Sequence, residues 1–556
     1  MAAAMATSCA LGVITHLAVS RHNGVEFDAH PWKLLVFTYL GYLGSLLYYN
    51  LSILKLALLS ALSQVAISAT LFSTGFFTSL VVYRLFFHRL RKFPGPKLAA
   101  VSQFYAMSLA AKDMKLCIEI QKLHQKYGDI IRIGPRYLSI ARPEAIPLVY
   151  GPPMRCVKGA WYAQTGGDPQ VCSLNQTRDM ELHRSRRRAW DRAFSMKALD
   201  SYVPRVAAKC EKLVEQLRSR KDQAIDIQKW ASFFAFDVMG DVGLGKQFGT
   251  LDTGKDHPAI AAVHDSMYAV GLMTPVPWLI SLLTAIPGAA SAIQDFQAYC
   301  ASAVDEKAKT LNKDTEPGDI MAWLFKAKYE NDRSAPPGVQ ALHEDSRLII
   351  AAGSDTTLAA LTTLTYYLCT HPAAQRKLQA ALDAADDSTN FAAGGAIPYL
   401  DAVINETMRL WPPATAAMPR LTPAEGLHVR DGAGNEVFIP GGVTVAVPPY
   451  TLHRDARNYA DPDAFVPERW TAEGGFEARP EEGAFMPFSR GPANCAGKNF
   501  AKMELRMVVA RLYGEFWFEL AEEEKEGAED WERKMMDTVS LTVPGLKVRI
   551  SSRRGE

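Results

Sequence analysis

The sequence predicts a mainly α-helical catalytic domain with small β-sheets, preceded by N-terminal transmembrane helices. Three observations lead to this fold class. Apolar residues recur at three- and four-residue spacings through long segments, a pattern typical of helices, at Ala193–Ser219, His343–Thr370 and Tyr399–Leu410. Strand-like segments are short: Ile130–Ile133, Val437–Ile439, Val443–Val447 and Ser540–Ile550, the last with a Pro-Gly turn. The N-terminal region contains long stretches without charge.

These charge-free stretches predict a membrane anchor. Leu34–Leu54 and Leu56–Tyr83 each exceed the roughly 20 residues that cross a hydrocarbon layer of about 30 Å. A weaker apolar stretch, Met1–Ser20, lacks the basic start and cleavage site of a signal peptide. We expect residues 1–91 to form an anchor with two or three hydrophobic segments, residues 92–97 (KFPGPK) a Pro-rich hinge, and residues 98–556 the catalytic domain. A buried pair of core helices is the alternative.

The distribution of charge and cysteine narrows the location and the class of protein. A basic cluster, Arg84 to Lys92, follows the second long stretch and predicts that the rest of the chain is cytoplasmic. The net charge of +2 gives no global attraction to nucleic acid. The eight cysteines show no paired spacing, which argues against a disulfide framework or a structural zinc site and favours a reducing compartment.

One cysteine stands apart from the others. Cys495 lies in the loop FSRGPANCAGKNF, residues 488–500, where Gly491, Pro492 and Gly497 favour a tight turn before a helical pattern. A helix N-terminus and nearby cations lower the pKa of a thiol, so we expect Cys495 to act as a thiolate ligand. A buried structural cysteine is the alternative reading for any single cysteine of the chain.

A second motif lies about 140 residues upstream, inside an apolar helical run. The hexapeptide Ala352–Thr357 places an acid, Asp355, next to an alcohol, Thr356. Such a pair is costly in the middle of a buried helix unless it serves a purpose. A threonine hydroxyl can also return to a backbone carbonyl and bend the helix. An ordinary helix with a few polar interior residues is the alternative.

A third motif joins an acid and two arginines. Glu406 and Arg409 are three residues apart in a helical run that Pro412 and Pro413 end, so the two share a helix face. Such pairs are common and usually contribute little at a surface. The sequence Pro-Glu-Arg-Trp follows about 60 residues later and supplies Arg469.

The order and separation of these motifs resemble the cytochrome P450 family, and the resemblance covers roughly residues 94–551. It implies a heme-thiolate fold in which Cys495 is the axial ligand of the iron in heme b, iron protoporphyrin IX. Phe488, Gly491 and Gly497 match the ligand loop. The resemblance further implies that Asp355 relays protons, that Thr356 holds a water, and that Gly353 leaves room for dioxygen. Glu406, Arg409 and Arg469 match a structural triad behind the loop.

The resemblance also implies how the heme propionates are held. His183 and Arg187 occupy the places of a tryptophan and an arginine on a family helix, and Arg420 matches a basic position that contacts a propionate. The chain departs from the pattern at Ala493, where the family more often has arginine. Arg490 lies three residues earlier and is a candidate replacement.

These matches imply a heme-thiolate monooxygenase that inserts one oxygen atom from dioxygen into an apolar substrate. The closest resemblance is to fungal microsomal members, which implies the endoplasmic reticulum membrane with the catalytic domain on the cytosolic side, and secondary metabolism as the setting. Electrons would come from NADPH through a membrane-bound flavoprotein reductase, docked near the basic residues Arg490, Lys498, Lys502 and Arg506. The expected pocket lining includes Ile350, Ala351, Leu358, Ala359, Ala414–Met418 and Val539–Leu541.

Two other functions stay open at this point. A heme-thiolate isomerase or dehydratase would rearrange a peroxide without dioxygen or electrons, but such enzymes commonly lack the pair formed here by Asp355 and Thr356. A heme-binding protein without turnover is the second alternative.

Overall fold

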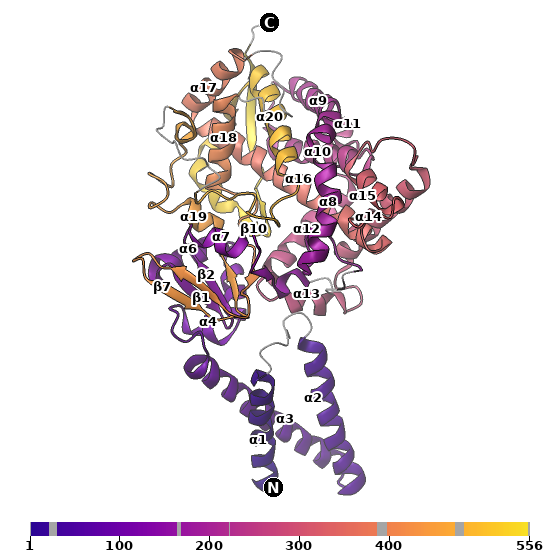
Figure 1. The fold of residues 1–556 in the computed structure, drawn as a ribbon, viewed down its shortest axis with the longest axis vertical. Coiled ribbons are helices and arrows are strands. Elements are labelled where there is room, and N and C mark those ends of the chain that lie inside the picture. The colour runs from indigo at the N-terminus through magenta and orange to yellow at the C-terminus, as the bar shows by residue number, and fades with distance from the viewer. Residues whose placement is uncertain are drawn as a thin grey trace.

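A computed structural model describes residues 2–21, 31–163, 168, 170–221, 223–385, 397–472 and 483–553. Figure 1 shows the N-terminal helices projecting from one end of a larger body. In that body, helices surround the long α16, the strands β1, β2 and β7 lie on the side nearer the N-terminal helices, and the C-terminal strands lie beside α20 at the other end. The arrangement confirms the predicted fold class, mainly α with small β-sheets.

The segment that the sequence predicts to be a membrane anchor, called the anchor below, consists of α1 (Ala2–Arg21), α2 (Pro31–Tyr48) with a π-helical turn η1 (Tyr49–Ile53), and α3 (Leu58–Val82) with a second such turn η2 (Tyr83–Phe87). Among the described residues, two helices are long and apolar enough to cross a membrane: Leu58–Phe87, which is largely unburied, and Val339–Thr370, most of which is core. The predicted span Leu34–Leu54 is not among them. The helical structure is interrupted at Lys55, whose φ is +50°.

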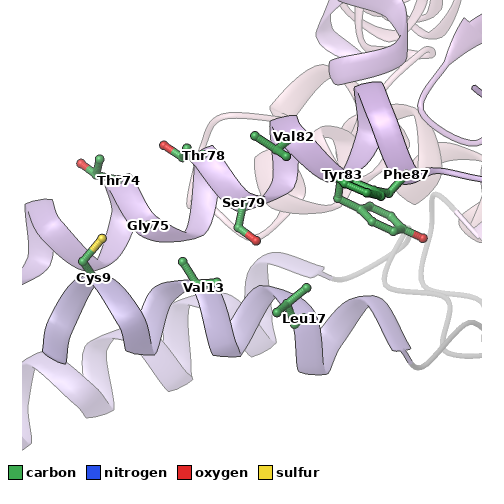
Figure 2. Close-up of a pocket in the computed structure, with 10 residues that line it drawn as sticks. All are labelled: Cys9, Val13, Leu17, Thr74, Gly75, Thr78, Ser79, Val82, Tyr83 and Phe87. Atoms are coloured by element: carbon green, nitrogen blue, oxygen red, sulfur yellow. The ribbon is translucent and has the colours of Figure 1, made fainter. Parts of the chain in front are cut away.

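Two glycines allow α1 to cross α3 at backbone contact. A Cβ at Gly12 would lie 2.1 Å from the Phe72 carbonyl oxygen, and one at Gly75 would lie 2.2 Å from that of Cys9. Small residues permit this close approach of apolar helices. A cavity of about 530 Å³ lies between the two helices, lined by residues such as Val13 and Val82 (Figure 2). It belongs to the anchor, away from α16 and α20 (Figure 1).

The predicted hinge is fixed to the first strand of the catalytic domain. The Arg132 N–H donates to the Pro94 carbonyl oxygen at 2.7 Å. Gly95 has a φ of +151°, and a Cβ there would meet the Arg132 carbonyl oxygen at 2.3 Å. The Arg132 guanidinium also donates to the Arg84 carbonyl at 3.2 Å. The Pro-rich segment therefore sets a defined exit from the anchor.

The sheets are small, as predicted. The largest has the order β1 (Ile130–Gly134), β2 (Tyr137–Ile140), β8 (Thr444–Ala446), β5 (Arg420–Leu421) and β3 (Val157–Lys158), with only β2 and β8 parallel. The others join β6 (Leu427–Arg430) to β7 (Glu436–Ile439), β10 (Met536–Thr538) to β11 (Ser540–Thr542), and β4 (Ile225–Asp226) and β9 (Phe516–Leu520) to β12 (Lys547–Ser552). The predicted segment Ser540–Ile550 is therefore wrong as one unit, because its two ends join different sheets.

The elements nearest the motifs are α8 (Met180–Ala193), α16 (Val339–Thr370), α18 (Pro398–Leu410) and α20 (Lys498–Glu515). The predicted helix Ala193–Ser219 begins later than expected, because Ser195 caps α9 (Met196–Arg218) by accepting from the Ala198 N–H. The remaining helices are α4 (Lys97–Val101), α5 (Phe104–Ala110), α6 (Leu116–Tyr127), α7 (Ala145–Tyr150), η3 (Ala160–Ala163), α10 (Ile227–Val238), η4 (Met239–Leu244), α11 (Thr250–Thr253), α12 (Pro258–Met273), α13 (Pro277–Thr284), α14 (Ser291–Thr310), α15 (Ile320–Tyr329), α17 (Pro372–Asp383), α19 (Pro449–His453), η5 (Pro467–Trp470), α21 (Glu522–Lys525), η7 (Ala528–Asp530) and η8 (Glu532–Lys534).

Candidate functional site

The Cys495 loop is closed by its own backbone. The Cys495 N–H donates to the Phe488 carbonyl at 3.0 Å, and the Asn494 N–H donates to the Gly491 carbonyl at 3.0 Å. Gly491 has a φ of +71°, and a Cβ there would lie 1.8 Å from the Tyr150 carbonyl oxygen. A side chain at Gly491 would therefore be excluded twice, by backbone conformation and by contact with α7.

Gly497 has a different environment. A Cβ there would meet only the Phe194 ring, at an ordinary 3.7 Å. The protein's own packing thus leaves room beside the loop that a side chain at Gly497 would fill. This room adjoins Cys495, two residues earlier in the chain.

The Cys495 thiol is the only exposed one among the eight cysteines, all of which lie in described residues. Although part of its surface is accessible, many protein atoms lie around the thiol, and the resulting desolvation raises its pKa. A backbone hydrogen bond with Gly497 and the positive charges of Arg187 and Lys498 oppose the rise without cancelling it. The helix end and the cations therefore lower the thiol pKa as expected, but desolvation raises it by more. A metal cation bound to the sulfur would complete the deprotonation.

Arg187 fastens α8 to the cysteine loop. Its Nη1 donates to the Asn494 carbonyl at 2.8 Å and its Nη2 to the Asn494 side-chain oxygen at 3.1 Å. Its Nε donates to Asp191 at 2.7 Å. The resemblance to the family implied that Arg187 holds a heme propionate. In the structure its guanidinium spans the loop that carries Cys495. Arg490, the candidate replacement for an arginine at position 493, donates to the Phe485 carbonyl at 2.9 Å.

Helix α16 is buried along most of its length but opens locally at the second motif. Ala352 is exposed and Thr356 is half-buried, whereas Asp355 is buried. The Thr356 hydroxyl donates to the Ala352 carbonyl at 2.8 Å, so its lone pairs remain available as acceptors. Asp355 and Thr356 are neighbours on the helix and differ in accessibility, with Thr356 on the open side.

Gly353 serves helix packing. A Cβ there would lie 2.7 Å from both the Cε and the Sδ of Met239, in the π-helical turn η4. The same contact between helices appears at Gly243, where a Cβ would lie 2.6 Å from Ile349 Cγ2. Room for dioxygen beside Gly353, which the resemblance implied, is on this side occupied by Met239.

One buried acid was missed by the sequence reasoning. Glu504 on α20 is fully buried, and the Thr357 hydroxyl lies 3.1 Å from its Oε2, joining α20 to α16. Its Oε1 has no partner among the described residues. Burial raises the pKa of Glu504 to about 8. The only signal in the sequence was an acid among apolar helical residues, nine positions after Cys495.

The structure brings Glu406, Arg409 and Arg469 together in a buried network. Arg409 donates to both Glu406 oxygens, at 2.8 and 2.9 Å, and Arg469 Nε donates to Oε1 at 3.0 Å. Trp470 Nε1 donates to Oε2 at 2.8 Å, a partner that the sequence reasoning did not identify although it adjoins Arg469. The Val466 N–H supplies a further bond at 2.9 Å. We call these residues the Glu406 network.

A second buried group contains cations in excess. Arg420, His183 and Lys158 are nearly inaccessible, and Arg420 Nε has no hydrogen-bond partner in the described part of the chain. Burial, with smaller contributions from the charges of Lys158, Arg187, Arg186 and Arg420, lowers the pKa of His183 to about 3. His183 is therefore neutral at physiological pH, as a hydrogen-bonding replacement for tryptophan would be.

Lys158 belongs to this group, although no motif in the sequence pointed to it. Strands β3 and β5 place Lys158 directly opposite Arg420, and the two positions are far apart in the chain. The Tyr162 ring centroid lies 5.2 Å from Lys158 Nζ and 5.4 Å from Arg420 Cζ. The Arg420 Nη1 also donates to the Tyr162 hydroxyl at 2.6 Å. We call Lys158, Tyr162 and Arg420 the Lys158–Arg420 cluster.

These features fit a heme. An accessible thiol, room beside Gly497, an open segment of α16 and buried cations with an unpartnered guanidinium nitrogen match a planar metal cofactor that carries two carboxylates. Cys495 would ligate the iron, and the cations around His183 would neutralise the carboxylates.

Comparison with known proteins decides the family. A family model described as cytochrome P450 matches residues 94–546. The chain belongs to the cytochrome P450 family. A Fusarium pseudograminearum protein named cytochrome P450 monooxygenase FCK2 is 36% identical over 550 residues, which is 98% of this chain and 96% of that protein. A protein of Aspergillus fumigatus named tryprostatin B 6-hydroxylase is 34% identical, over 92% of this chain and 90% of its own length. A Phaeosphaeria nodorum relative, cytochrome P450 monooxygenase sthD, is 37% identical over 81% of this chain and 92% of its own length.

As a P450, the chain is an oxidoreductase with a heme-thiolate cofactor, and the monooxygenase relatives favour this activity over the isomerase and binding-protein alternatives. Small organic molecules and a redox partner belong to this activity. One apolar N-terminal helix, Leu58–Phe87, is consistent with membrane anchoring.

Proposed function

We propose that this P450 hydroxylates, or similarly oxidises, an apolar organic molecule of fungal secondary metabolism. Dioxygen, two electrons and two protons would yield the oxidised product and water. The accessible Cys495 thiol in a loop fixed by Arg187 carries the proposal, because it is the ligand that this chemistry requires. Cys495 would hold the iron through Sγ, and the heme, when bound, would supply the iron chemistry that activates dioxygen.

Protein residues would control the protons. Thr356 Oγ1 gives its own proton to the Ala352 carbonyl, so it would accept a hydrogen bond from a water on the open side of α16. Asp355 would pass protons from solvent toward that water. The two residues follow one another on the helix, which lets the carboxyl sit in the protein while the hydroxyl faces the open segment.

Substrate contacts would come from the accessible apolar positions. Ala351, Ala352, Ala416, Ala417 and Val539 retain accessible surface. Ile350, Leu358 and Ala359, which the sequence placed in the pocket lining, are buried in the main hydrophobic core. Small side chains at the accessible positions favour a bulky substrate.

Electrons would come from NADPH through a membrane-bound flavoprotein reductase. Arg506 is engaged by Asp401 at 2.6 and 2.8 Å, which reduces its value for steering. Exposed Arg184 and Arg188 lie on α8, the helix that Arg187 fastens to the cysteine loop. We include them with Lys498 and Lys502 in the docking surface. The basic residues after α3 favour the cytosolic side of the endoplasmic reticulum.

A carbon monoxide difference spectrum of the reduced full-length protein tests the cofactor and its ligand. We expect the red-shifted band of thiolate-ligated heme, and Cys495→Ala should abolish it. NADPH consumption with a reductase and candidate apolar substrates then tests turnover. A wild-type protein that binds heme without this band would refute the proposal.

Thr356→Ala tests the proton pathway. We expect heme content and the thiolate band to be retained, while the share of NADPH recovered as product falls several-fold and hydrogen peroxide rises. Thr362→Ala is a matched control, since the Thr362 hydroxyl makes the same i−4 bond, at 2.8 Å, in the fully buried part of α16. Full coupling in Thr356→Ala would remove Thr356 from the mechanism.

A further inference from the structure

The cysteine loop lacks the arginine that would hold a propionate, and this raises the question of which residue replaces it. Position 493 is alanine, Arg490 is bonded to the Phe485 carbonyl, and Arg187 is bonded to the loop and Asp191. The remaining buried cations near His183 are Arg186, Lys158 and Arg420.

Arg186 is already neutralised. Its Nη2 donates to Asp345 at 2.8 Å, and both side chains are buried. Its Nη1 donates to the Cys172 carbonyl and the Thr177 hydroxyl, each at 2.8 Å. Asp345 also accepts from the Leu174 N–H at 2.8 Å. This pair therefore shapes the segment around residue 174 and has no charge to spare.

Lys158 and Arg420 differ from Arg186 in lacking an acid. Each is only 2% exposed, and the hydrogen-bond partners of both among the described residues are backbone carbonyls and the Tyr162 hydroxyl, none of them a carboxylate. They stand opposite each other across an antiparallel pair of strands, a position where like charges destabilise. Burial together with the charge of Arg420 also lowers the pKa of Lys158 well below its usual value.

A buried lysine beside an arginine tends to lose its proton, and an anion bound between the two side chains would restore the charge of Lys158 and balance that of Arg420. The partners of Lys158 Nζ are the Leu174 and Asn175 carbonyls, at 3.3 and 2.7 Å, which carry no net charge. Tyr162 spaces the two cations, and its hydroxyl accepts from Arg420. We propose that Lys158 replaces the missing loop arginine and, with Arg420, binds a heme propionate. This inference rests on the proposed function.

Lys158 could instead act only as a structural staple between β3 and residues 174–175. The two roles separate in a substitution that keeps donors but removes charge. Lys158→Gln keeps an NH₂ group that can donate to the carbonyls but removes the charge. Lys158→Met removes both the donors and the charge, and Lys158→Arg keeps both. Lys209 provides a matched control, because it is also a buried lysine but donates to Gln247 at 3.0 Å and lies beside Asp241.

The experiment uses the full-length, heme-loaded protein in detergent. Heme release is followed by transfer to excess apomyoglobin, after the thiolate band has been verified for each variant. We expect Lys158→Gln and Lys158→Met to release heme at least about tenfold faster, the range for losing one charge-assisted hydrogen bond. Lys158→Arg and Lys209→Met should stay near the wild-type rate. The propionate bending band in resonance Raman spectra should shift in Lys158→Gln and not in Lys209→Met.

The outcomes separate the two proposals. A wild-type rate in Lys158→Gln beside a fast rate in Lys158→Met would reduce Lys158 to a staple and overturn this inference. Wild-type rates in both would overturn it as well. In either case a thiolate band in the wild type would leave the proposed function standing, whereas absence of that band would refute the function itself. If Lys158→Met does not accumulate, the comparison of Lys158→Gln with Lys158→Arg carries the test.

Discussion

The Glu406 network and the Lys158–Arg420 cluster are both buried and rich in cations, but their charges are balanced differently. Glu406 accepts five hydrogen bonds, and backbone carbonyls of residues such as His453 and Ala464 take up the remaining donors of Arg409. In the Lys158–Arg420 cluster, the two cations share a tyrosine and have no acid within the described part of the chain. A satisfied network is complete within the protein, whereas an excess of one sign indicates a ligand of the other.

The largest expected effect comes from breaking the balanced network. Glu406→Ala leaves Arg409 and Arg469 buried without their acid, which costs about 3–5 kcal/mol for a broken buried pair. We expect a large loss in the free energy of unfolding, measured by urea denaturation, and little heme-loaded protein. Glu468→Ala is the control, because its pair with Lys377 is partly exposed and should contribute less than about 1 kcal/mol. Equal stabilities of the two variants would contradict this view of the network.

Removing a cation from the Lys158–Arg420 cluster should affect heme retention and leave the stability of the fold nearly unchanged. Arg420→Met deletes one of two cations that face each other, so it also removes a repulsion. We therefore expect the urea midpoint to change little. Heme release should become roughly ten- to a hundredfold faster, since one charged partner of the carboxylates is lost. A variant that unfolds as easily as Glu406→Ala would mean that Arg420 is structural. Apomyoglobin transfer and urea denaturation on the same preparation make the comparison.

Glu504 is an intermediate case, an acid buried without a cation among the described residues. Its pKa is raised to about 8 by burial, so the folded state holds a proton that the unfolded state releases near pH 4.5. The free energy of unfolding should therefore fall as pH rises from about 4.5 to about 8, by up to about 1.4 kcal/mol per unit. Glu504→Gln should remove this slope. We would measure urea unfolding at several pH values. Parallel curves for the two proteins would contradict the buried, protonated state.

The sequence predicted the parts of the site that are local in the chain. The cysteine loop, the acid–alcohol pair and the Glu406–Arg409 pair each lie within a few residues, and strong helical patterns set their helices. It missed what long-range folding brings together. Lys158 meets Arg420 through strand pairing, Glu504 meets Thr357 between two helices, and Gly353 faces Met239 across a helix contact. No periodicity in one segment records the identity of a distant partner.

The smallest expected effect tests how far the Glu406 network depends on each donor. Trp470→Phe keeps the aromatic packing against Phe485, whose ring centroid lies 4.6 Å away, and removes only the bond from Nε1 to Glu406 at 2.8 Å. Because the two arginines still neutralise the acid, we expect a loss of about 1–2 kcal/mol in the free energy of unfolding, with heme release unchanged. Trp517→Phe is the control, since its Nε1 donates to exposed Glu519 at 3.0 Å. A faster heme release in Trp470→Phe, at unchanged stability, would show that the network acts on the cofactor and is not complete within the protein.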